Sequence, residues 1–310
     1  MTSSSSGRFL LIVSGLLLTS FLAGCTQSSW PPVTKEMSTE APVLTPEQAL
    51  DSFYLPPGYE IELVAAEPLV VDPVEIEFDG QGRMWVVEMR SYMPNLEGEG
   101  ERRPTGTIAV LEDANDDGRM DRRTVFLDSL VLPRSIKVLR DGVLVGAPPN
   151  LWWARDTDDD LRADERRTVR TDYGNPRSNP EHNANGLMWG MDNWIHNADH
   201  EMGHRLRDGT FAHRRTVDHG QWGISMDDLG RIYLNSNSDP LRIDLLDAHY
   251  YARNPNLARA RGLYEDLVED ESVWPVRPTP GLYRGYRPVL LRSYSTLSRF
   301  TSAGSPVVYR

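Results

Sequence analysis

Short apolar segments separated by clusters of Gly, Pro, Asn and Asp dominate the chain from residue 53 onward. Apolar or alternating segments of about four to eight residues predict strands. No long helical period occurs before the last third of the chain. The predicted strands are Ile61–Val64, Val74–Phe78, Met84–Glu88, Ile108–Glu112, Thr124–Leu127, Ser135–Leu139, Val143–Ala147, Leu151–Arg155, Leu187–Trp189, Trp194–Asn197, Gly223–Met226 and Ile232–Asn235. This pattern favours an all-β sandwich or propeller.

Two internal repeats favour the propeller. The segment Asp79–Val86, a turn followed by a strand, returns as Asp227–Leu234. An acidic segment, Asp113–Asp121, returns 43 residues later as Asp156–Asp164, and Arg-Arg-Thr-Val follows each copy within a few residues. A period near 43 residues is typical of propeller blades with four strands. The sequence therefore predicts a propeller rather than a sandwich.

The last third of the chain departs from this pattern. Residues 248–271 are rich in Leu, Arg and Ala, which predicts one or two helices inserted between blades. The chain ends in a strand-like segment, Pro306–Arg310. A strand-like segment and not a polar tail stands at this point, so the end is abrupt.

The first residues match a bacterial lipoprotein signal. Arg8 precedes an apolar run from Phe9 to Ala23, which ends in Leu-Ala-Gly-Cys at Cys25. Small residues before a cysteine at this point predict cleavage before Cys25 and lipid attachment to its thiol. The alternatives are an uncleaved anchor helix and a cysteine that stands there by chance.

Three regions follow from this interpretation. We expect a signal peptide at residues 1–24, a flexible tether rich in Ser, Thr and Pro at 25–52, and one folded domain at 53–310. The lipid would hold the protein on a membrane of the bacterial cell envelope, facing the periplasm or the exterior.

Charge and cysteine content narrow the possible partners. The chain has 310 residues and a formal net charge of −12, with no basic stripe, which argues against nucleic acid. A single cysteine excludes an internal disulfide framework and a Cys-x-x-Cys-His haem attachment site. Small molecules, sugars and divalent cations remain as partners.

The acidic repeats are candidate calcium loops, because oxygen ligands at alternate positions of a tight turn can converge on Ca²⁺. The first loop has Gly118 at its bend, whereas the second has Leu161, so the first is expected to bind better. Solvated acidic hairpins are the alternative. The candidate ligands are Asp113, Asn115, Asp117 and Asp121 in the first loop, and Asp156, Asp158, Asp160 and Asp164 in the second.

Three histidines, His196, His200 and His204, are spaced by four residues, which on a helix would suit Zn²⁺. Asn197 and Gly203 argue against a helix there. We therefore do not expect a metal site at these three residues.

The segment 179–200 is the best candidate for a chemical site. It combines a polar loop around His182 with a short aromatic strand, as at the end of an innermost blade strand. A histidine among asparagines suits a general base, because its charge state changes near neutral pH. The alternative is that His182 only stabilises a turn.

The same segment resembles a known family. Leu187, Gly190, Asp192 and Ile195 follow His182 with the spacing His-x4-Leu-x2-Gly-x-Asp-x2-Ile of soluble glucose and sorbosone dehydrogenases. The chain from Leu55 onward is more similar to the membrane-bound dehydrogenase-type propellers of bacterial envelopes. The phrases that carry this second similarity are Leu55–Tyr59, Asn185–Trp194 and Trp274–Arg277.

The resemblance implies a six-bladed propeller that uses pyrroloquinoline quinone, with His182 as catalytic base and Asn185 or Arg90 orienting the reacting groups. It also implies that this chain ends before the ring of blades closes. It implies a carbohydrate or alcohol substrate. An external acceptor would be needed for the electrons, because the haem domain of longer relatives is absent from this chain. Residues at equivalent positions after the repeated strands are expected to face the same channel mouth; they are Glu88, Arg90, Tyr92, Asn235, Asn237 and Arg242. Of these, Arg90, Tyr92, Asn235 and Arg242 are expected to contact the cofactor. Structural pairing among these residues is the alternative.

One departure from the dehydrogenase pattern keeps a second interpretation open. Gly186 occupies the position before Leu187 where the dehydrogenases carry arginine. The alternative function is therefore a non-catalytic propeller that binds a carbohydrate or a protein.

Overall fold

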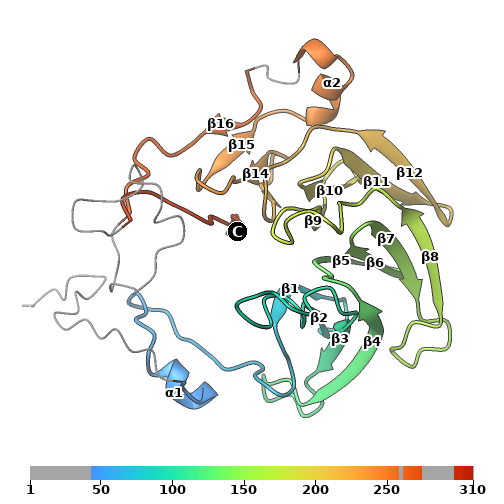
Figure 1. Cartoon of the computed structure of the whole chain (residues 1–310), viewed down its shortest axis with the longest axis vertical. Coiled ribbons are helices and arrows are strands. Elements are labelled where there is room, and N and C mark those ends of the chain that lie inside the picture. Colours follow the sequence, from blue (N-terminus) through green and yellow to red (C-terminus); the bar gives the residue numbers. More distant parts are fainter. Residues whose placement is uncertain (1–42, 258–260, 274–296, 310) are drawn as a thin grey trace, which may run out of the picture.

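The computed structural model describes residues 43–257, 261–273 and 297–309 (Figure 1). The predicted signal peptide, Cys25, most of the predicted tether and Trp274–Arg277 lie outside the described residues. Among the helices of the described ranges, none has both the length and the apolar character needed to span a bilayer.

The described strands form four antiparallel sheets, each built from four strands that are consecutive in the chain. The first sheet contains β1 (Pro73–Phe78), β2 (Met84–Glu88), β3 (Gly106–Glu112) and β4 (Arg122–Leu130). The second contains β5 (Ser135–Leu139), β6 (Gly142–Ala147), β7 (Asn150–Arg155) and β8 (Glu165–Arg170). The third contains β9 (Asn185–Trp189), β10 (Ile195–Ala198), β11 (Met202–Arg207) and β12 (Thr210–Arg215). The fourth contains β13 (Ser225–Met226), β14 (Ile232–Leu234), β15 (Arg242–Asp244) and β16 (Glu265–Asp266).

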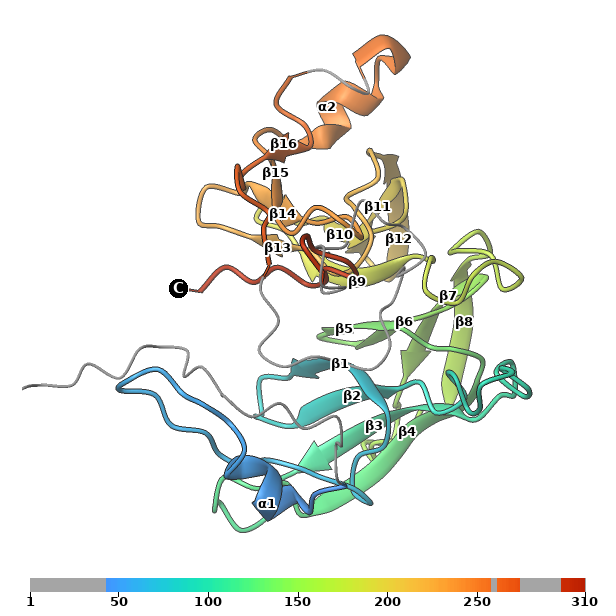
Figure 2. The same cartoon turned by 60° about the vertical axis from the view of Figure 1, so that its left-hand side comes forward.

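The four sheets lie side by side in an arc, and the first strand of each sheet lies toward its centre (Figures 1 and 2). The innermost strands are neighbours, since β5 contacts both β1 and β9. The C-terminal segment also runs into the centre of the arc (Figure 1). This nearly all-β arrangement is consistent with the predicted propeller, and the count of six blades stays a prediction.

Apolar side chains fill the spaces between neighbouring sheets. Trp85 and Phe126 meet edge to face, with ring centroids 4.8 Å apart, between the first and second sheets. Trp153 and Phe211 do the same at 5.3 Å between the second and third sheets. Aromatic pairs of this geometry stabilise beyond their buried area by about 0.5–1.5 kcal/mol. The sheets are therefore held at fixed positions around the centre.

Every predicted strand overlaps an observed strand except Ile61–Val64, for which the prediction was wrong. This segment forms no strand. A backbone hydrogen bond from the Met120 amide to the Val64 carbonyl links it to the loop between β3 and β4. The apolar residues that follow, including Leu69 and Val70, pack against the first sheet. These apolar residues therefore cover one side of the first sheet and do not form a strand of it.

Two short helices frame the sheets. α1 (Pro46–Leu50) lies within the segment expected to be a tether, and Thr45 and Gln48 form a capping box at its start. α2 (Ala248–Ala252) and the 3₁₀ turn η1 (Pro255–Leu257) lie within the predicted helical insertion. The same insertion also contains β16, which pairs with β15 and was not expected.

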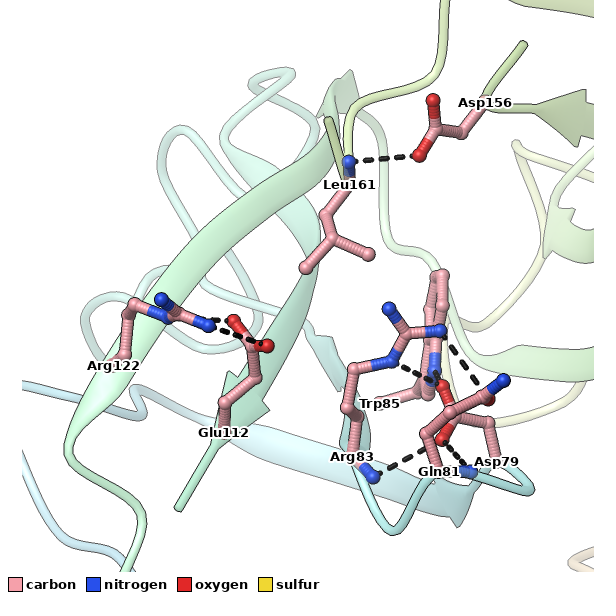
Figure 3. Close-up of polar contacts among 8 residues, drawn as sticks. All are labelled: Asp79, Gln81, Arg83, Trp85, Glu112, Arg122, Asp156 and Leu161. Carbon is pink, nitrogen blue, oxygen red and sulfur yellow. Dashed lines mark hydrogen bonds and ion pairs between the residues drawn. The ribbon is translucent and has the colours of Figure 1, made fainter. Parts of the chain in front are cut away.

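The turns between the first two strands of a sheet explain the first sequence repeat. Asp79 accepts hydrogen bonds from the Gln81 and Arg83 amides, the Arg83 Nε and the Trp85 Nε1 (Figure 3). Asp227 forms the corresponding bonds with Leu229, Arg231 and Tyr233 in the fourth sheet. A repeated aspartate therefore closes the β1–β2 and β13–β14 turns.

A candidate ligand site at the channel mouth

Loops from all four sheets meet at one end of the innermost strands. In an antiparallel sheet the start of the first strand and the end of the second lie at the same edge. The residues that this rule brings together are Tyr92 after β2, Arg134 before β5, Glu181 and His182 before β9, Asp199 after β10, Trp222 before β13 and Asn237 after β14. We call this end of the sheets the mouth.

A cavity of about 360 Å³ lies at the mouth. Tyr92, Glu181, Trp222 and Asn237 line it, together with residues 302–305. The Tyr92 hydroxyl donates to Glu181 Oε1 over 2.6 Å, which links the first sheet to the loop before the third. The Ser305 amide donates to the Trp222 carbonyl over 2.7 Å. The cavity therefore combines an aromatic ring with carboxylate, amide and hydroxyl groups.

Arg134 is the cation of the mouth, and its side chain is almost fully buried. Its Nη1 donates to the Pro180 carbonyl over 2.6 Å, and its guanidinium lies over the Trp222 ring at 5.9 Å from the centroid. Its Nε has no hydrogen-bond partner among the described residues. Burial lowers the pKa of Arg134 to about 10, while Tyr173, Asp199 and Tyr92 oppose this, so the group is charged at neutral pH.

His182 lies at the rim of the mouth with an exposed side chain. Its backbone amide donates to the Asn179 carbonyl over 3.0 Å, which closes the loop that carries it. Burial raises the pKa of Asp199, and attraction to His182 and Arg134 opposes the rise. Asp199 therefore interacts electrostatically with both the candidate base and the buried cation.

A second carboxyl group, Asp218, lies near Asp199. Burial and the charge of Asp199 raise the pKa of Asp218 to about 7, with smaller contributions from Glu201 and Asp244. Asp218 Oδ1 is buried and lacks a hydrogen-bond partner within the described ranges. Burial together with repulsion from neighbouring carboxylates disfavours the ionised form.

Sequence reasoning missed Arg134, Asp199 and Asp218. Arg134 directly precedes an innermost strand, the position that the loop of His182 also occupies, so the blade repeat offered a signal for it. Asp199 follows β10 and so is separated from His182 by two strands. Nothing in the sequence places Asp218 near Asp199.

Two predicted site residues fix the loops of the mouth. Asn185 is buried, donates to the Asn183 and Gln221 carbonyls, and accepts from the Gly223 amide. Asn235 is buried and bonds both backbone groups of Trp222. Their side chains are therefore engaged in holding the loops before β9 and β13.

The other three predicted cofactor contacts lie in different places. Tyr92 reaches the mouth cavity. Arg90 instead pairs with the buried Glu88, which also binds Arg123. Arg242 pairs with Asp239 and donates to the Tyr264 carbonyl. Among these three, only Tyr92 lines the cavity.

A comparison with protein families decides the classification. The family described as "Domain of unknown function (DUF7133)" matches residues 45–310. The chain belongs to this family. No curated protein matches it.

The DUF7133 chain is also similar to several solved structures. One is a gluconolactonase from Xanthomonas campestris, at 12% identity, a TM-score of 0.39 and coverage of 57% of this chain and 58% of that one. Another is the pyrroloquinoline quinone domain of pyranose dehydrogenase from Coprinopsis cinerea, at 16% identity and a TM-score of 0.37. The match covers 56% of this chain and 46% of that one. A third is the calcium structure of a carbohydrate-active enzyme of family AA12 from Trichoderma reesei, at 11% identity and a TM-score of 0.41. The match covers 70% of this chain and 60% of that one. The DUF7133 chain thus spans about half to three fifths of the length of these proteins.

The two aspartate loops of the DUF7133 chain share one conformation, as their sequence repeat predicts. Asp113 and Asp156 each accept from the backbone amides four and five residues later. Leu161 adopts a left-handed φ of 64°, as Gly118 does at 85°. The Asp156–Leu161 bond is drawn in Figure 3. Leu161 also packs against the core between the first and second sheets, which offsets the strain of about 1–3 kcal/mol for such a backbone.

Leu161 adopts the left-handed bend for which glycine was expected, so the bend does not distinguish the two loops. The ranking of the first loop above the second stays a prediction. Ligand oxygens of Asp156, Asp158 and Asp164 lie within 4.8 Å of one another, whereas the first loop has Asn115 at the position of Asp158. The pKa of Asp158 is raised by Asp160 first, and then by burial, Asp164 and Asp156. A cation at this point would relieve the repulsion.

We expect Ca²⁺ to stabilise the protein through the second loop. At about 100-fold excess over Kd the melting temperature should rise by roughly 5 °C or more, because the ligand binds only the folded state. Asp164→Asn should remove most of this rise, while the matched variant Asp121→Asn in the first loop should keep it. Thermal melts with Ca²⁺ and with chelator measure this. Equal melting temperatures of the wild type in both conditions would rule the site out.

Proposed function

We propose that the mouth binds a neutral sugar or polyol, and that His182 acts there as a base toward one of its hydroxyl groups. The observation that carries the proposal is the cavity lined by Tyr92, Glu181 and Trp222, from loops of three sheets, where Glu181 directly precedes the exposed His182 in the chain. Cavities of about 300–1,000 Å³ are typical of small-ligand sites, and this one lies at the lower end of that range. A monosaccharide is the ligand class that suits its size.

The lining groups match the two faces of a sugar. The Trp222 ring offers an apolar surface for the C–H face of a pyranose, and its half-buried position keeps it fixed. Glu181 and Asn237 supply hydrogen-bond acceptors and donors for hydroxyl groups. Tyr92 holds Glu181 in place through their short hydrogen bond.

The proton step belongs to His182. A neutral imidazole that takes a proton from a hydroxyl becomes a cation, and the nearby Asp199 carboxylate stabilises that cation. Burial raises the pKa of Asp199, and attraction to Arg134 opposes that rise and so favours the carboxylate form. These residues can therefore perform the proton half of a sugar dehydrogenase reaction.

The hydride half requires an acceptor, and the resemblance implies pyrroloquinoline quinone, which carries three carboxylates. Arg134, with its unpartnered buried Nε, matches one of them. Lys137, which lines the adjacent cavity of about 430 Å³, is already paired with Glu77, and Glu75 and Asp227 line the same space. The described residues thus fit a neutral sugar and do not fit the quinone, so no step is assigned to it.

Binding without turnover is the second candidate function. It is favoured by Gly186, which leaves no side chain where the dehydrogenases carry arginine. Sugar titration followed by turnover assays with an artificial electron acceptor separates the two candidates. Turnover supports the dehydrogenase, and saturable binding alone supports the binding protein. Absence of both contradicts the proposed site.

A further inference from the structure

A second cavity, of about 430 Å³, adjoins the mouth cavity, and we call it the central cavity. Val74 of β1, Trp222 before β13 and Ser305 line both spaces, so the two cavities share a wall. The Ser305 amide donates to the Trp222 carbonyl over 2.7 Å, which fixes this part of the wall. A sugar that covers the Trp222 ring at the mouth therefore lies beside the central cavity.

Large apolar side chains from separate parts of the chain line the central cavity. The C-terminal segment, which runs into the centre of the arc (Figure 1), contributes residues 306–308, and β1 contributes Val74. An aromatic ring suits walls that contain methionine and tryptophan, because thioethers and indole rings both make favourable contacts with it. The apolar residues contributed by the third and fourth sheets and their turns are Leu187, Met188, Trp189, Met191, Ile224 and Met226.

Several of these side chains are exposed within the described ranges. Trp189 is 49% exposed and Val74 is 46% exposed. Met191 and Val307 are exposed as well. An apolar ligand group that displaces water from such surfaces gains free energy through the hydrophobic effect. The central cavity therefore offers an apolar group affinity as well as space.

The charged residues of the central cavity have partners within the protein. Lys137 forms an ion pair with Glu77, and Asp227 forms one with Arg231. Arg134 donates to a backbone carbonyl of the loop before β9 over 2.6 Å. An uncharged ligand group leaves all of these interactions intact.

Glu75, which lines the same space, is largely neutral at pH 7. Burial raises the pKa of Glu75 to about 8, and the charge of Glu77 acts in the same direction. The Ile136 amide and Lys137 oppose this rise. The buried carboxyl therefore agrees with an uncharged occupant of the central cavity.

We propose that the sugar bound at the mouth carries an aromatic aglycone, and that this group fills the central cavity. Such a substrate presupposes the proposed sugar site, because the wall shared at Trp222 places the two groups side by side. The substrate class is therefore an aryl glycoside. Its anomeric oxygen carries the aglycone, so His182 acts on a different hydroxyl of the sugar.

Calorimetric titration of the full chain with paired glycosides tests the aglycone. The probes are the methyl and phenyl glycosides of glucose, galactose, mannose and xylose, each as both anomers, beside the free monosaccharides. For at least one sugar, the phenyl glycoside should bind roughly tenfold or more tightly than the methyl glycoside, because the ring buries additional apolar surface.

Two variants at exposed positions locate the phenyl group. Trp189→Ser removes an aromatic wall of the central cavity, and Val307→Asp places a charge in it. Each should bring the ratio of phenyl to methyl glycoside affinity close to one. The matched control Trp194→Ser replaces a half-buried tryptophan under the Arg205 guanidinium, outside both cavities, and should keep the wild-type ratio. Circular dichroism establishes that each variant is folded.

The outcomes separate the aglycone from the sugar site itself. Binding of free monosaccharides or methyl glycosides, with no gain from the phenyl group, would overturn the aglycone and leave the sugar site standing. A phenyl gain that either folded variant retains would place the ring outside the central cavity and would also overturn it. If no sugar or glycoside bound, both the sugar site and the aglycone would be wrong.

Discussion

Replacing His182 with alanine is expected to lower turnover of the preferred sugar about 10²- to 10⁴-fold, the usual loss when a general base is removed. The side chain is exposed at the rim of the mouth, so its removal leaves the packing of the sheets intact. Sugar affinity should change little, because Trp222 and Glu181 supply the contact surface. The assay follows an artificial electron acceptor, with and without added pyrroloquinoline quinone.

His249→Ala is the matched control for this experiment. His249 is a partly exposed histidine on α2, away from the residues that line the mouth, and its loss should leave turnover unchanged. If His182→Ala retained the rate of an active wild type, His182 would not be the base. Turnover without added pyrroloquinoline quinone would agree with the finding that the residues of the mouth do not fit the three carboxylates of this cofactor.

Replacing Asp218 with asparagine is expected to stabilise the protein above neutral pH. The folded-state pKa of about 7 lies above the ordinary value of 3.8, so the unfolded chain releases its proton first as the pH rises. The stability that the protonated carboxyl provides is therefore lost progressively between pH 3.8 and pH 7. The asparagine variant avoids this loss, which is on the order of 2–4 kcal/mol above pH 7.

The pH dependence distinguishes this effect from ordinary changes in packing. The difference in free energy of unfolding between Asp218→Asn and the wild type should be small at pH 4, widen as the pH rises, and level off above pH 7. Asp208→Asn, at an exposed turn, should show no such trend. Denaturant unfolding of both proteins from pH 4 to above pH 7 measures this difference in free energy of unfolding. A constant difference at all pH values would show that Asp218 ionises normally in the folded protein.

The sequence predicted the inner part of each sheet well and the outer part poorly. Strands such as β2 and β6 are buried along their length, so their apolar residues stand out. Strands β8 and β12 lie at the outer edge and contain mostly Arg, Thr and Glu, or Arg, Thr and His, so no apolar alternation marks them. The cross-strand pair of His204 and His213 could not be foreseen, because neither of its strands was predicted.

The positions of two candidate residues could be predicted in outline for a similar reason, while their roles stay predictions. His182 and Tyr92 lie beside recognisable strands and turn motifs, before β9 and after β2. Arg134 follows a short loop without a motif, and its importance arises from burial against Trp222, a residue far away in sequence. Asp218 acquires its shifted pKa only from the fold, through neighbours on other loops and strands. Contacts between blades are therefore the part that sequence patterns could not supply.

Sugar binding to the mouth is the most direct test of the central claim. Titration of the wild type with a panel of neutral monosaccharides, followed by calorimetry, should show saturable binding of at least one. Trp222→Leu should abolish that binding because it removes the aromatic surface of the cavity. Trp194→Leu, a similarly half-buried tryptophan at the β9–β10 turn, should retain it. Equal sugar affinity of the wild type and Trp222→Leu, or no binding by the wild type, would contradict a sugar site at the mouth.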